Sequence, residues 1–327
     1  MGGGSVRVMV GVDVGGTKVA AGRVTRGGRL SGEPRVVATG THDVMAVVES
    51  IVEATQAVVR DADSVGESVA GVGIGCAGTV DPGRGVVVTS PNLPLIDAPL
   101  AALVEDRVGL PVCLDNDANV AAWAEVQVGA AQGCRHVVLL ALGTGVGGGI
   151  VLDGRLYRGA TGAAAEIGHT IIVAGGELCG CGARGCLEAY VSGRALERTA
   201  RRLVDELPAL EARALREACE GGTLTGIVVG DLAVSGDPAA RSAVDEVGRW
   251  LGIGLSNMVN IFNPDMIVVG GGLGELGELL LAPARVVLGA TALAPGKDTV
   301  RVTSARLGNE AGILGAGLLA WTESARV

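Results

Sequence analysis

Four side chains that commonly bind zinc lie close together in the middle of the sequence. The stretch "CGCGARGCLEAY" (179–190) holds Cys179, Cys181 and Cys186 within eight residues, and His169 precedes Cys179 by ten positions. One imidazole and three thiolates make a closed tetrahedral zinc site, which leaves no position for a catalytic water. Seven cysteines, an odd number, in a chain without a visible export signal favour a metal site over disulfides. The alternative is a group of buried cysteines without metal.

A second polar group lies in "LDNDANVAAWAE" (114–125), which follows the strand-like "GLPVC" and enters a helical pattern. It contains Asp115, Asn116, Asp117 and Asn119. One of these residues is expected to be the N-cap of the helix. For Asp115 and Asn119, a capping role and a functional role are equally good interpretations. A helix start needs one N-cap, so capping does not explain a second polar pair at the same junction. A carboxylate here could accept a proton from a substrate hydroxyl, as phosphoryl transfer to an alcohol requires.

Three glycine-rich turns next to apolar runs could bind phosphate: "DVGGTK" (13–18), "LGTGVGGG" (142–149) and "VGGG" (269–272). Glycine lets the backbone approach a ligand closely, and the N–H groups of such turns can cradle phosphate oxygens. The first turn lacks the spacing of a Walker A or dinucleotide motif, and alone it is equally an ordinary hairpin. The candidate nucleotide and Mg²⁺ ligands are Asp13 for the ion and Gly15, Gly16, Thr17, Lys18, Thr144, Gly145, Gly271 and Gly272 for phosphate.

The composition limits the kinds of partner. With 327 residues and 48% hydrophobic content, the chain can bury a large core in two domains or in a duplicated one. Aromatic residues are 2%, the net charge is −9 and the basic residues form no cluster, so nucleic acid and anionic membranes are not expected partners. The longest apolar stretch, 137–152, is broken by glycines and is short for a membrane span. A cytoplasmic protein is expected.

Strand-like and helical patterns alternate, which predicts an α/β protein. Strands are predicted over 6–14, 18–24, 69–78, 137–143, 148–154 and 266–272, and helices over 43–62, 192–207 and 237–264. Residues 9–30 and 137–159 share one order: apolar strand, Gly/Thr turn, second strand, short turn, then Gly-Arg-Leu. This similarity indicates two related halves, and chance similarity in a glycine-rich chain is the alternative.

Taken together, these motifs resemble the ROK family of sugar kinases and repressors, in the actin/hexokinase-like superfamily, over residues 11 to about 317. The resemblance is closest to the bacterial glucokinase branch. Gly168-His169, Cys179 to Gly182, Gly185-Cys186, Glu188 and Tyr190 match the zinc signature of the family. The family's Asp-x-Gly-Gly-Thr-Lys, Asn-Asp and Glu-x-Gly-His motifs are matched by 13–18, 116–117 and 166–169.

The resemblance implies a fold and an assembly. It predicts two actin/ribonuclease H-like domains, duplicated βββαβαβα halves with a cleft between them. The N-terminal domain is expected over 1–120 and the C-terminal domain, with the zinc site, over 121–327, with the final helix packing back on the N-terminal domain. Members of the family are commonly homodimers or homotetramers.

The resemblance also implies an activity, namely an ATP-dependent kinase acting on the 6-hydroxyl of glucose or a close analogue. Asp117 would be the general base, and Asn92, Asn116, Glu166, His169 and Glu188 would bind the sugar. The glycine turns would hold ATP, Mg²⁺ would be the catalytic ion, and zinc would be structural. One ring nitrogen of His169 would bind zinc while the other faces the sugar, and Cys186 would anchor the loop that aims Glu188.

Other functions remain open at this point. The stretch "SPNLPLIDAPL" (90–100) keeps Pro91-Asn92 but has Leu95 and other apolar residues where glucokinases of the family often have Trp. A kinase for kanosamine, N-acetylmannosamine or N-acetylglucosamine is therefore the main alternative, and polyphosphate could replace ATP. A sugar-sensing repressor would need a helix-turn-helix domain before Asp13, for which the sequence leaves no room. A zinc hydrolase would need an open metal position.

Overall fold

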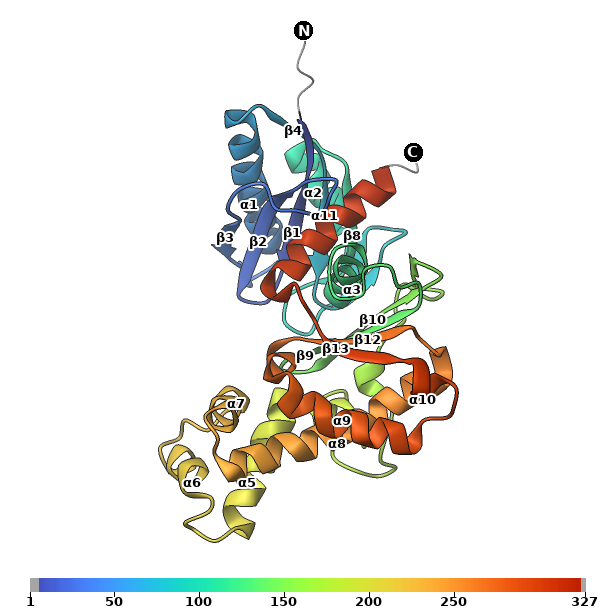
Figure 1. The fold of residues 1–327 in the computed structure, drawn as a ribbon. Coiled ribbons are helices and arrows are strands. Elements are labelled where there is room, and N and C mark those ends of the chain that lie inside the picture. Colours follow the sequence, from blue (N-terminus) through green and yellow to red (C-terminus); the bar gives the residue numbers. More distant parts are fainter. Residues whose placement is uncertain (1–5, 325–327) are drawn as a thin grey trace. The chain divides into compact units, whose positions relative to one another are not determined.

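The structure is a computed structural model, and it describes residues 6–324. These residues form two compact units (Figure 1). The first unit comprises residues 6–133, 149–164 and 306–324, and the second comprises 134–148 and 165–305. Among the described residues, no helix combines the length and the hydropathy that crossing a membrane requires.

The main sheet of the first unit has five strands in the order β3-β2-β1-β4-β8. Its first three strands are antiparallel, and β4 and β8 continue the sheet in parallel with β1. A separate three-stranded sheet has the order β5-β6-β7. The strands are β1 (Val6–Val14), β2 (Lys18–Val24), β3 (Arg35–Ala38), β4 (Glu67–Cys76), β5 (Thr79–Asp81), β6 (Val86–Thr89), β7 (Ile96–Ala98) and β8 (Val112–Asn116).

Helices cover both faces of this sheet. The valines of β1 at 10, 12 and 14 belong to one buried cluster with residues of α1 and α2, whereas Ala20 and Val24 of β2 belong to another with residues of α3 and α11. Alternate residues of a strand point to opposite faces, so the two clusters lie on the two sides of the sheet. The helices are α1 (Val44–Ser64), α2 (Leu100–Val108), α3 (Asp117–Gln127) and α11 (Ala311–Ser324), and a 3₁₀ turn covers Gly308–Glu310.

Helix α11 packs directly on the backbone of the first-unit sheet. A Cβ atom added at Gly11 or Gly73 would lie 1.9 Å from the carbonyl oxygen of Ile313 or Ala316, respectively. Only glycine permits this approach, which places the final helix in the first unit. The first unit also extends to Gly133, past the expected boundary after residue 120, because α3 packs against α11.

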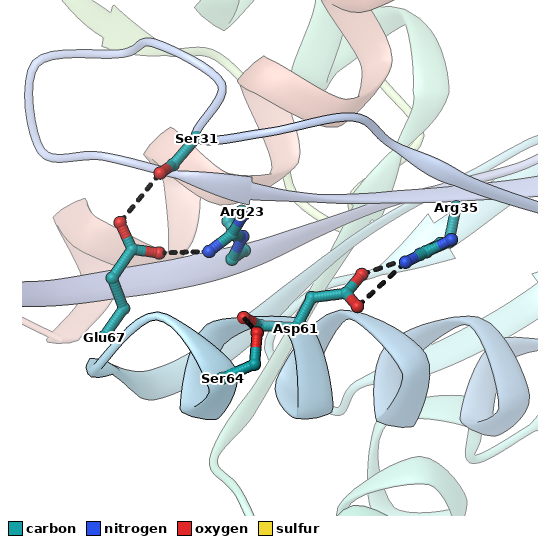
Figure 2. A network of polar contacts seen from close by, with 6 residues as sticks. All are labelled: Arg23, Ser31, Arg35, Asp61, Ser64 and Glu67. Atoms are coloured by element: carbon teal, nitrogen blue, oxygen red, sulfur yellow. Dashed lines mark hydrogen bonds and ion pairs between the residues drawn. The ribbon is translucent and has the colours of Figure 1, made fainter.

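Ion pairs link β2 to β4 and β3 to α1 in this unit (Figure 2). The carboxylate of Glu67 accepts hydrogen bonds from Arg23 and from Ser31, each at 2.7 Å. The guanidinium of Arg35 donates to both oxygens of Asp61, at 2.6 and 2.8 Å. The first pair is largely buried, whereas Arg35 is half exposed, so Glu67 is the more constrained carboxylate of the two.

The second unit repeats the strand order of the first. Its sheet has the order β11-β10-β9-β12-β13, with β12 parallel to both β9 and β13. In each sheet the third, second, first, fourth and fifth strands of the set are neighbours in that order, which confirms the predicted α/β fold with two related halves. The strands are β9 (Val137–Leu142), β10 (Val146–Leu152), β11 (Arg155–Leu156), β12 (Met266–Gly270) and β13 (Arg301–Ser304).

Helices form most of the remainder of the second unit. The long helix α8 contacts α5, α7 and α9, and α6 joins α5 and α7 in a group at one end of the unit (Figure 1). The helices are α4 (Glu188–Val191), α5 (Gly193–Glu206), α6 (Arg213–Glu220), α7 (Gly226–Val234), α8 (Pro238–Phe262), α9 (Glu278–Thr291) and α10 (Gly296–Thr299), with 3₁₀ turns over Ile167–His169 and Gly272–Leu276.

Candidate active site

The predicted base lies where β8 ends and α3 begins. Asn116 is the N-cap of α3, and its Oδ1 accepts hydrogen bonds from the N–H groups of Ala118 and Asn119. Its Nδ2 donates to Oδ1 of Asp117 at 2.8 Å and to the carbonyl oxygen of Gly78 at 2.9 Å. Asn116 therefore uses both ends of its amide within the protein, and one of these bonds orients Asp117.

Asp117 and Asp13 form an acidic pair in the first unit. Burial raises the pKa of Asp117, against the opposing effect of hydrogen bonds from Ala118 and Asn116. Burial and then the charge of Asp117 raise the pKa of Asp13 to about 6, while Lys18 acts in the opposite direction. Two partly buried carboxylates with like charges and oxygen ligands suit a divalent cation such as Mg²⁺. This chemistry fits the predicted role of Asp13.

The other two polar residues at this junction hold it in place. Asp115 is fully buried, and its Oδ2 accepts a hydrogen bond from Nε of Arg158 at 2.6 Å. Its Oδ1 accepts from the backbone N–H of Asn116 and from Nδ2 of Asn119, each at 2.8 Å. The N-cap of α3 is therefore Asn116, and neither Asp115 nor Asn119 has the capping role for which the sequence made them candidates. Arg158 neutralises the buried charge that this arrangement requires.

The four predicted metal ligands meet in the second unit. One ligand atom from each of His169, Cys179, Cys181 and Cys186 lies within 4.8 Å of every other. The Sγ atoms of Cys181 and Cys186 are 3.7 Å apart, and Sγ of Cys179 is 3.7 Å from Nδ1 of His169. A tetrahedron with zinc–sulfur bonds of about 2.3 Å has edges of about 3.7 Å. The cluster therefore has the ligand types and the spacing of a closed zinc site.

Two glycines fold the loop that carries the cysteines. Gly182 and Gly185 have φ of +90° and +87°, which favours glycine. A Cβ atom at Gly185 would lie 1.7 Å from the carbonyl oxygen of Val173. A tight turn returns the chain at Ala183, whose carbonyl accepts from the N–H of Cys179 at 2.8 Å. The glycines between the cysteines are thus needed for the loop to close on a metal.

Glu188, two residues after the last cysteine, lies beside both the cluster and the turn before β10. Its Oε2 accepts a hydrogen bond from the N–H of Val146 at 3.0 Å, and its Oε1 lies 3.3 Å from Sγ of Cys179. A Cβ atom at Gly145 would lie 2.4 Å from Oε2. The carboxylate of Glu188 therefore occupies the space beside Gly145, and binding of phosphate by Gly145 stays a prediction.

Glu166 and His169 lie at the two ends of one short 3₁₀ turn, with Glu166 just before it and His169 as its last residue. Both side chains are exposed, and they flank Gly168, where a Cβ atom would lie 2.3 Å from the carbonyl oxygen of Val146. Ala165 has φ of +68°, an unusual conformation for a residue with a side chain, immediately before Glu166. Nδ1 of His169 faces the cysteines, which leaves Nε2 available to carry a proton toward a ligand. Glu166, His169 and Glu188 thus converge on the start of β10.

The first glycine turn brings Asn92 next to the predicted phosphate ligands. The N–H of Gly15 donates to the carbonyl of Lys18 at 3.0 Å, which closes the turn, and Thr17 and Lys18 are exposed. A Cβ atom at Gly16 would lie 3.1 Å from Cβ of Asn92. Asn92 and this turn are therefore neighbours in the first unit.

The apolar residues that follow Asn92 lie in the core. Leu95 is fully buried and Leu93 is 6% exposed, and both belong to the cluster with α1 and α2. The residue in place of the usual Trp is therefore a core residue in this structure. Ile96, which is 77% exposed, is the apolar residue of this segment that faces solvent.

A cavity of about 590 Å³ lies in the second unit, a volume in the range of small-molecule sites. Of the predicted nucleotide ligands, Thr144 and Gly272 line it. Gly271, with φ of +77°, makes the turn before Gly272, and a Cβ atom there would lie 2.4 Å from the carbonyl oxygen of Leu142. The turns at 142–149 and 269–272 therefore meet at one cavity.

Helices α5 and α7 contribute a wall of this cavity that was not predicted from the sequence. Gly193 and Gly226, the first residues of these helices, line it, and a Cβ atom at Gly226 would lie 2.6 Å from the carbonyl oxygen of Gly193. The N-caps are Ser192 and Thr225. A signal was present, because Ser-Gly and Thr-Gly at helix starts expose backbone N–H groups that can bind anions.

Comparison with known proteins agrees with this geometry. Residues 9–323 match the ROK family. A glucokinase from Streptomyces coelicolor is 41% identical over 95% of this chain and 96% of its own length. An N-acetylmannosamine kinase from Citrobacter koseri is 33% identical over 94% of this chain and 97% of its own length. The crystal structure of a ROK family glucokinase from Streptomyces griseus in complex with glucose and AMPPNP has a TM-score of 0.83 and 40% identity, over 96% of this chain and 99% of that one. These matches confirm the predicted fold class. The chain belongs to the ROK family.

Proposed function

We propose that this protein is an ATP-dependent hexose kinase that phosphorylates the 6-hydroxyl of glucose or of a close glucose analogue. The relatives named glucokinase, which align over almost the whole chain, support a kinase of this class. The observation that carries the proposal is Asp117, a partly buried carboxylate oriented by a hydrogen bond from Asn116 at the start of α3.

Asp117 has the properties of a general base. Its hydrogen bonds from Asn116 and Ala118 reach Oδ1, which leaves Oδ2 for the hydroxyl of the sugar. Burial raises its pKa and so strengthens it as a proton acceptor. In the proposed reaction the hydroxyl oxygen attacks the γ-phosphorus, its proton passes to Oδ2, and ADP leaves with the electrons of the broken bond.

We propose Glu166, His169 and Glu188 as the sugar ligands within the second unit, and Asn92 as a sugar ligand within the first. The carboxylates accept hydrogen bonds from sugar hydroxyls, and Nε2 of His169 donates one. Asn116 was expected to bind the sugar directly. Because both ends of its amide are bonded within the protein, we assign it instead to the positioning of Asp117.

The three expected cofactors would have separate places. The cavity with Thr144 and Gly272 would hold the nucleotide. Asp13 would help to hold Mg²⁺, which offsets the charge of the transferred phosphoryl group. His169 and the three cysteines would hold zinc, which fixes the orientation of the imidazole and supports the loop that ends at Glu188.

An amino-sugar kinase is the second candidate. The relative named N-acetylmannosamine kinase aligns over 94% of this chain, so the shared scaffold is compatible with a substituted hexose. A site that hydrogen-bonds each hydroxyl discriminates against analogues that leave a buried polar group unpaired. Measured preference between glucose and amino sugars therefore distinguishes a glucose kinase from an amino-sugar kinase.

The test is ADP release by the purified protein with Mg²⁺ and ATP against glucose, kanosamine, mannose, N-acetylmannosamine and N-acetylglucosamine at matched concentrations. The position of the phosphate is read from ³¹P–¹H correlation spectra of the product. Asp117→Asn should lower kcat by about 10²–10⁴-fold. The matched control is Asp106→Asn, at an exposed position of α2. Near-normal turnover of Asp117→Asn would disprove the assignment of the base, and no turnover of any hexose would disprove the proposed activity.

A further inference from the structure

The turn before β10 and the segment from Glu188 to Gly193 are joined at two points. Oε2 of Glu188 accepts the N–H of Val146 at 3.0 Å, and the N–H of Gly193 donates to the carbonyl of Gly143 at 2.9 Å. The N–H of Gly143 also donates to the carbonyl of Gly145 at 2.9 Å, which closes the turn. A carboxylate at one end and a backbone amide at the other therefore fix this turn against α4 and α5.

Both parts of this arrangement reach the nucleotide cavity. The turn contributes Gly143 and Thr144 to its lining, and the segment contributes Gly193 and the next residue, Arg194. Glu188 itself lies outside the lining, beside the metal cluster, at the place where the proposed function has it bind the sugar. Only four residues, 189–192, thus lie in the sequence between Glu188 and the cavity-lining Gly193.

We propose that Glu188 is a positioning residue for the nucleotide in addition to its proposed contact with the hexose. Its carboxylate fixes the N–H of Val146 and thereby sets the turn that forms one wall of the nucleotide cavity. This inference rests on the proposed function for the nature of the two ligands. A carboxylate has about four hydrogen-bond acceptor positions, so the bond to Val146 leaves others for sugar hydroxyls.

Gly145 provides independent geometric support for this role. A side chain at this position would occupy the place of Oε2, since a Cβ atom would lie 2.4 Å from it. Its φ lies outside the left-handed region, so backbone conformation does not explain the glycine. Gly145 is therefore explained by the space that the carboxylate needs in order to reach Val146.

One functional consequence is that the two substrates influence each other. If a sugar hydroxyl orders the Glu188 carboxylate, it also orders the turn, and the nucleotide then meets a preformed wall. By thermodynamic reciprocity, the nucleotide raises the affinity for the sugar by the same factor. The affinity of the wild-type protein for a nucleotide should therefore rise when hexose is present.

The decisive test measures nucleotide binding without sugar. Calorimetric titration of a non-hydrolysable ATP analogue with Mg²⁺ should show about tenfold weaker binding to Glu188→Ala, equivalent to about 1.4 kcal/mol. Glu188→Gln should bind the analogue nearly as the wild type does, because its amide oxygen can still accept the N–H of Val146. Gly145→Ala should resemble Glu188→Ala, since it displaces the carboxylate. The matched control is Gly289→Ala on α9, where a Cβ atom meets no atom within 4 Å.

Two outcomes would overturn the inference. Unchanged nucleotide affinity in both Glu188→Ala and Gly145→Ala would show that the turn does not depend on the carboxylate. Equal weakening in Glu188→Gln and Glu188→Ala would show that charge, rather than the bond to Val146, is responsible. Because no sugar is present, these results do not depend on which hexose is the substrate. Loss of hexose turnover with unchanged nucleotide affinity would leave the proposed function intact and refute the positioning role alone.

Discussion

Replacing Asp13 by Asn should stabilise the protein and at the same time inactivate it. Burial and the charge of Asp117 raise the pKa of Asp13 from 3.8 to about 6 in the folded state, so folding favours the protonated form. For a raised pKa, the stabilising contribution is complete below the unfolded pKa and is lost as the pH rises through the folded pKa. At neutral pH, the ionised Asp13 therefore opposes folding in the absence of a bound cation.

The size of the effect follows from the two pKa values. A change from 3.8 to about 6 corresponds to about 3 kcal/mol at pH 8, at 1.36 kcal/mol for each pKa unit. The same two values give about 0.6 kcal/mol at pH 4, where the carboxyl group is largely protonated in the folded state. Asp13→Asn should therefore raise the unfolding free energy by up to about 3 kcal/mol at pH 8 and by much less at pH 4.

The assay is urea unfolding at both pH values, followed by tryptophan fluorescence. Trp123 and Trp321 belong to the first unit together with Asp13, so the signal reports mainly on that unit. Asp106→Asn, at an exposed position, is the control for loss of one negative charge. Mg²⁺ should stabilise the wild type more than Asp13→Asn. The reasoning is refuted if Asp13→Asn gains equally at pH 4 and pH 8, or if it is no more stable than the wild type at pH 8.

Three further predictions follow from other parts of the structure. Cys181→Ser should lose bound zinc and should also yield less soluble protein, because metal binding is coupled to folding. Metal analysis together with thermal unfolding tests this, and a stable, zinc-free variant would argue against the metal site. Glu125→Ala should lower the free energy of unfolding in urea by at least about 3 kcal/mol, since this fully buried carboxylate accepts hydrogen bonds from the N–H groups of residues 130, 306 and 307. A decrease below about 1 kcal/mol would contradict this reasoning. Leu95→Ala should lower the free energy of unfolding by about 2–5 kcal/mol, because Leu95 is fully buried. Leu95→Met conserves volume and should leave the order of preference among hexoses unchanged in the ADP-release assay. An altered order would show that this core position affects specificity.

The elements with strong local signals could be predicted from the sequence. The strands expected over 6–14 and 18–24 have those bounds in the structure, because apolar runs end at a glycine turn. The helix predicted over 237–264 is α8, which begins at Pro238 after the N-cap Asp237 and ends just before Asn263-Pro264, because Pro suits a first helical turn and disfavours a helical residue before it. The helix predicted over 192–207 is α5, and Ser192 is its N-cap. These signals act within a few residues, so they are readable without tertiary structure.

Contacts between distant segments could not be predicted in the same way. Arg158 gives no local sign that it pairs with Asp115, and nothing near Gly145 shows that Glu188 needs its space. Helices α5 and α7, which both pack against α8, form one wall of the cavity only in the folded chain. The metal ligands were easier to predict, because three of the four lie within eight residues. The burial of Leu95 could not be predicted from its neighbours in the sequence, because Leu95 belongs to a core cluster that includes residues of α1 and α2.

The return of α11 to the first sheet also has a consequence for synthesis on the ribosome. The first unit is interrupted by residues 165–305, and the backbone of α11 packs against Gly11 and Gly73. During translation the part of the sheet that α11 covers therefore stays exposed until residues 311–324 leave the exit tunnel. The second unit has all its strands by residue 304, so it can form its own core first. The segment made first would thus be the last to complete its fold, and it is the part of the nascent chain in greatest need of chaperone protection.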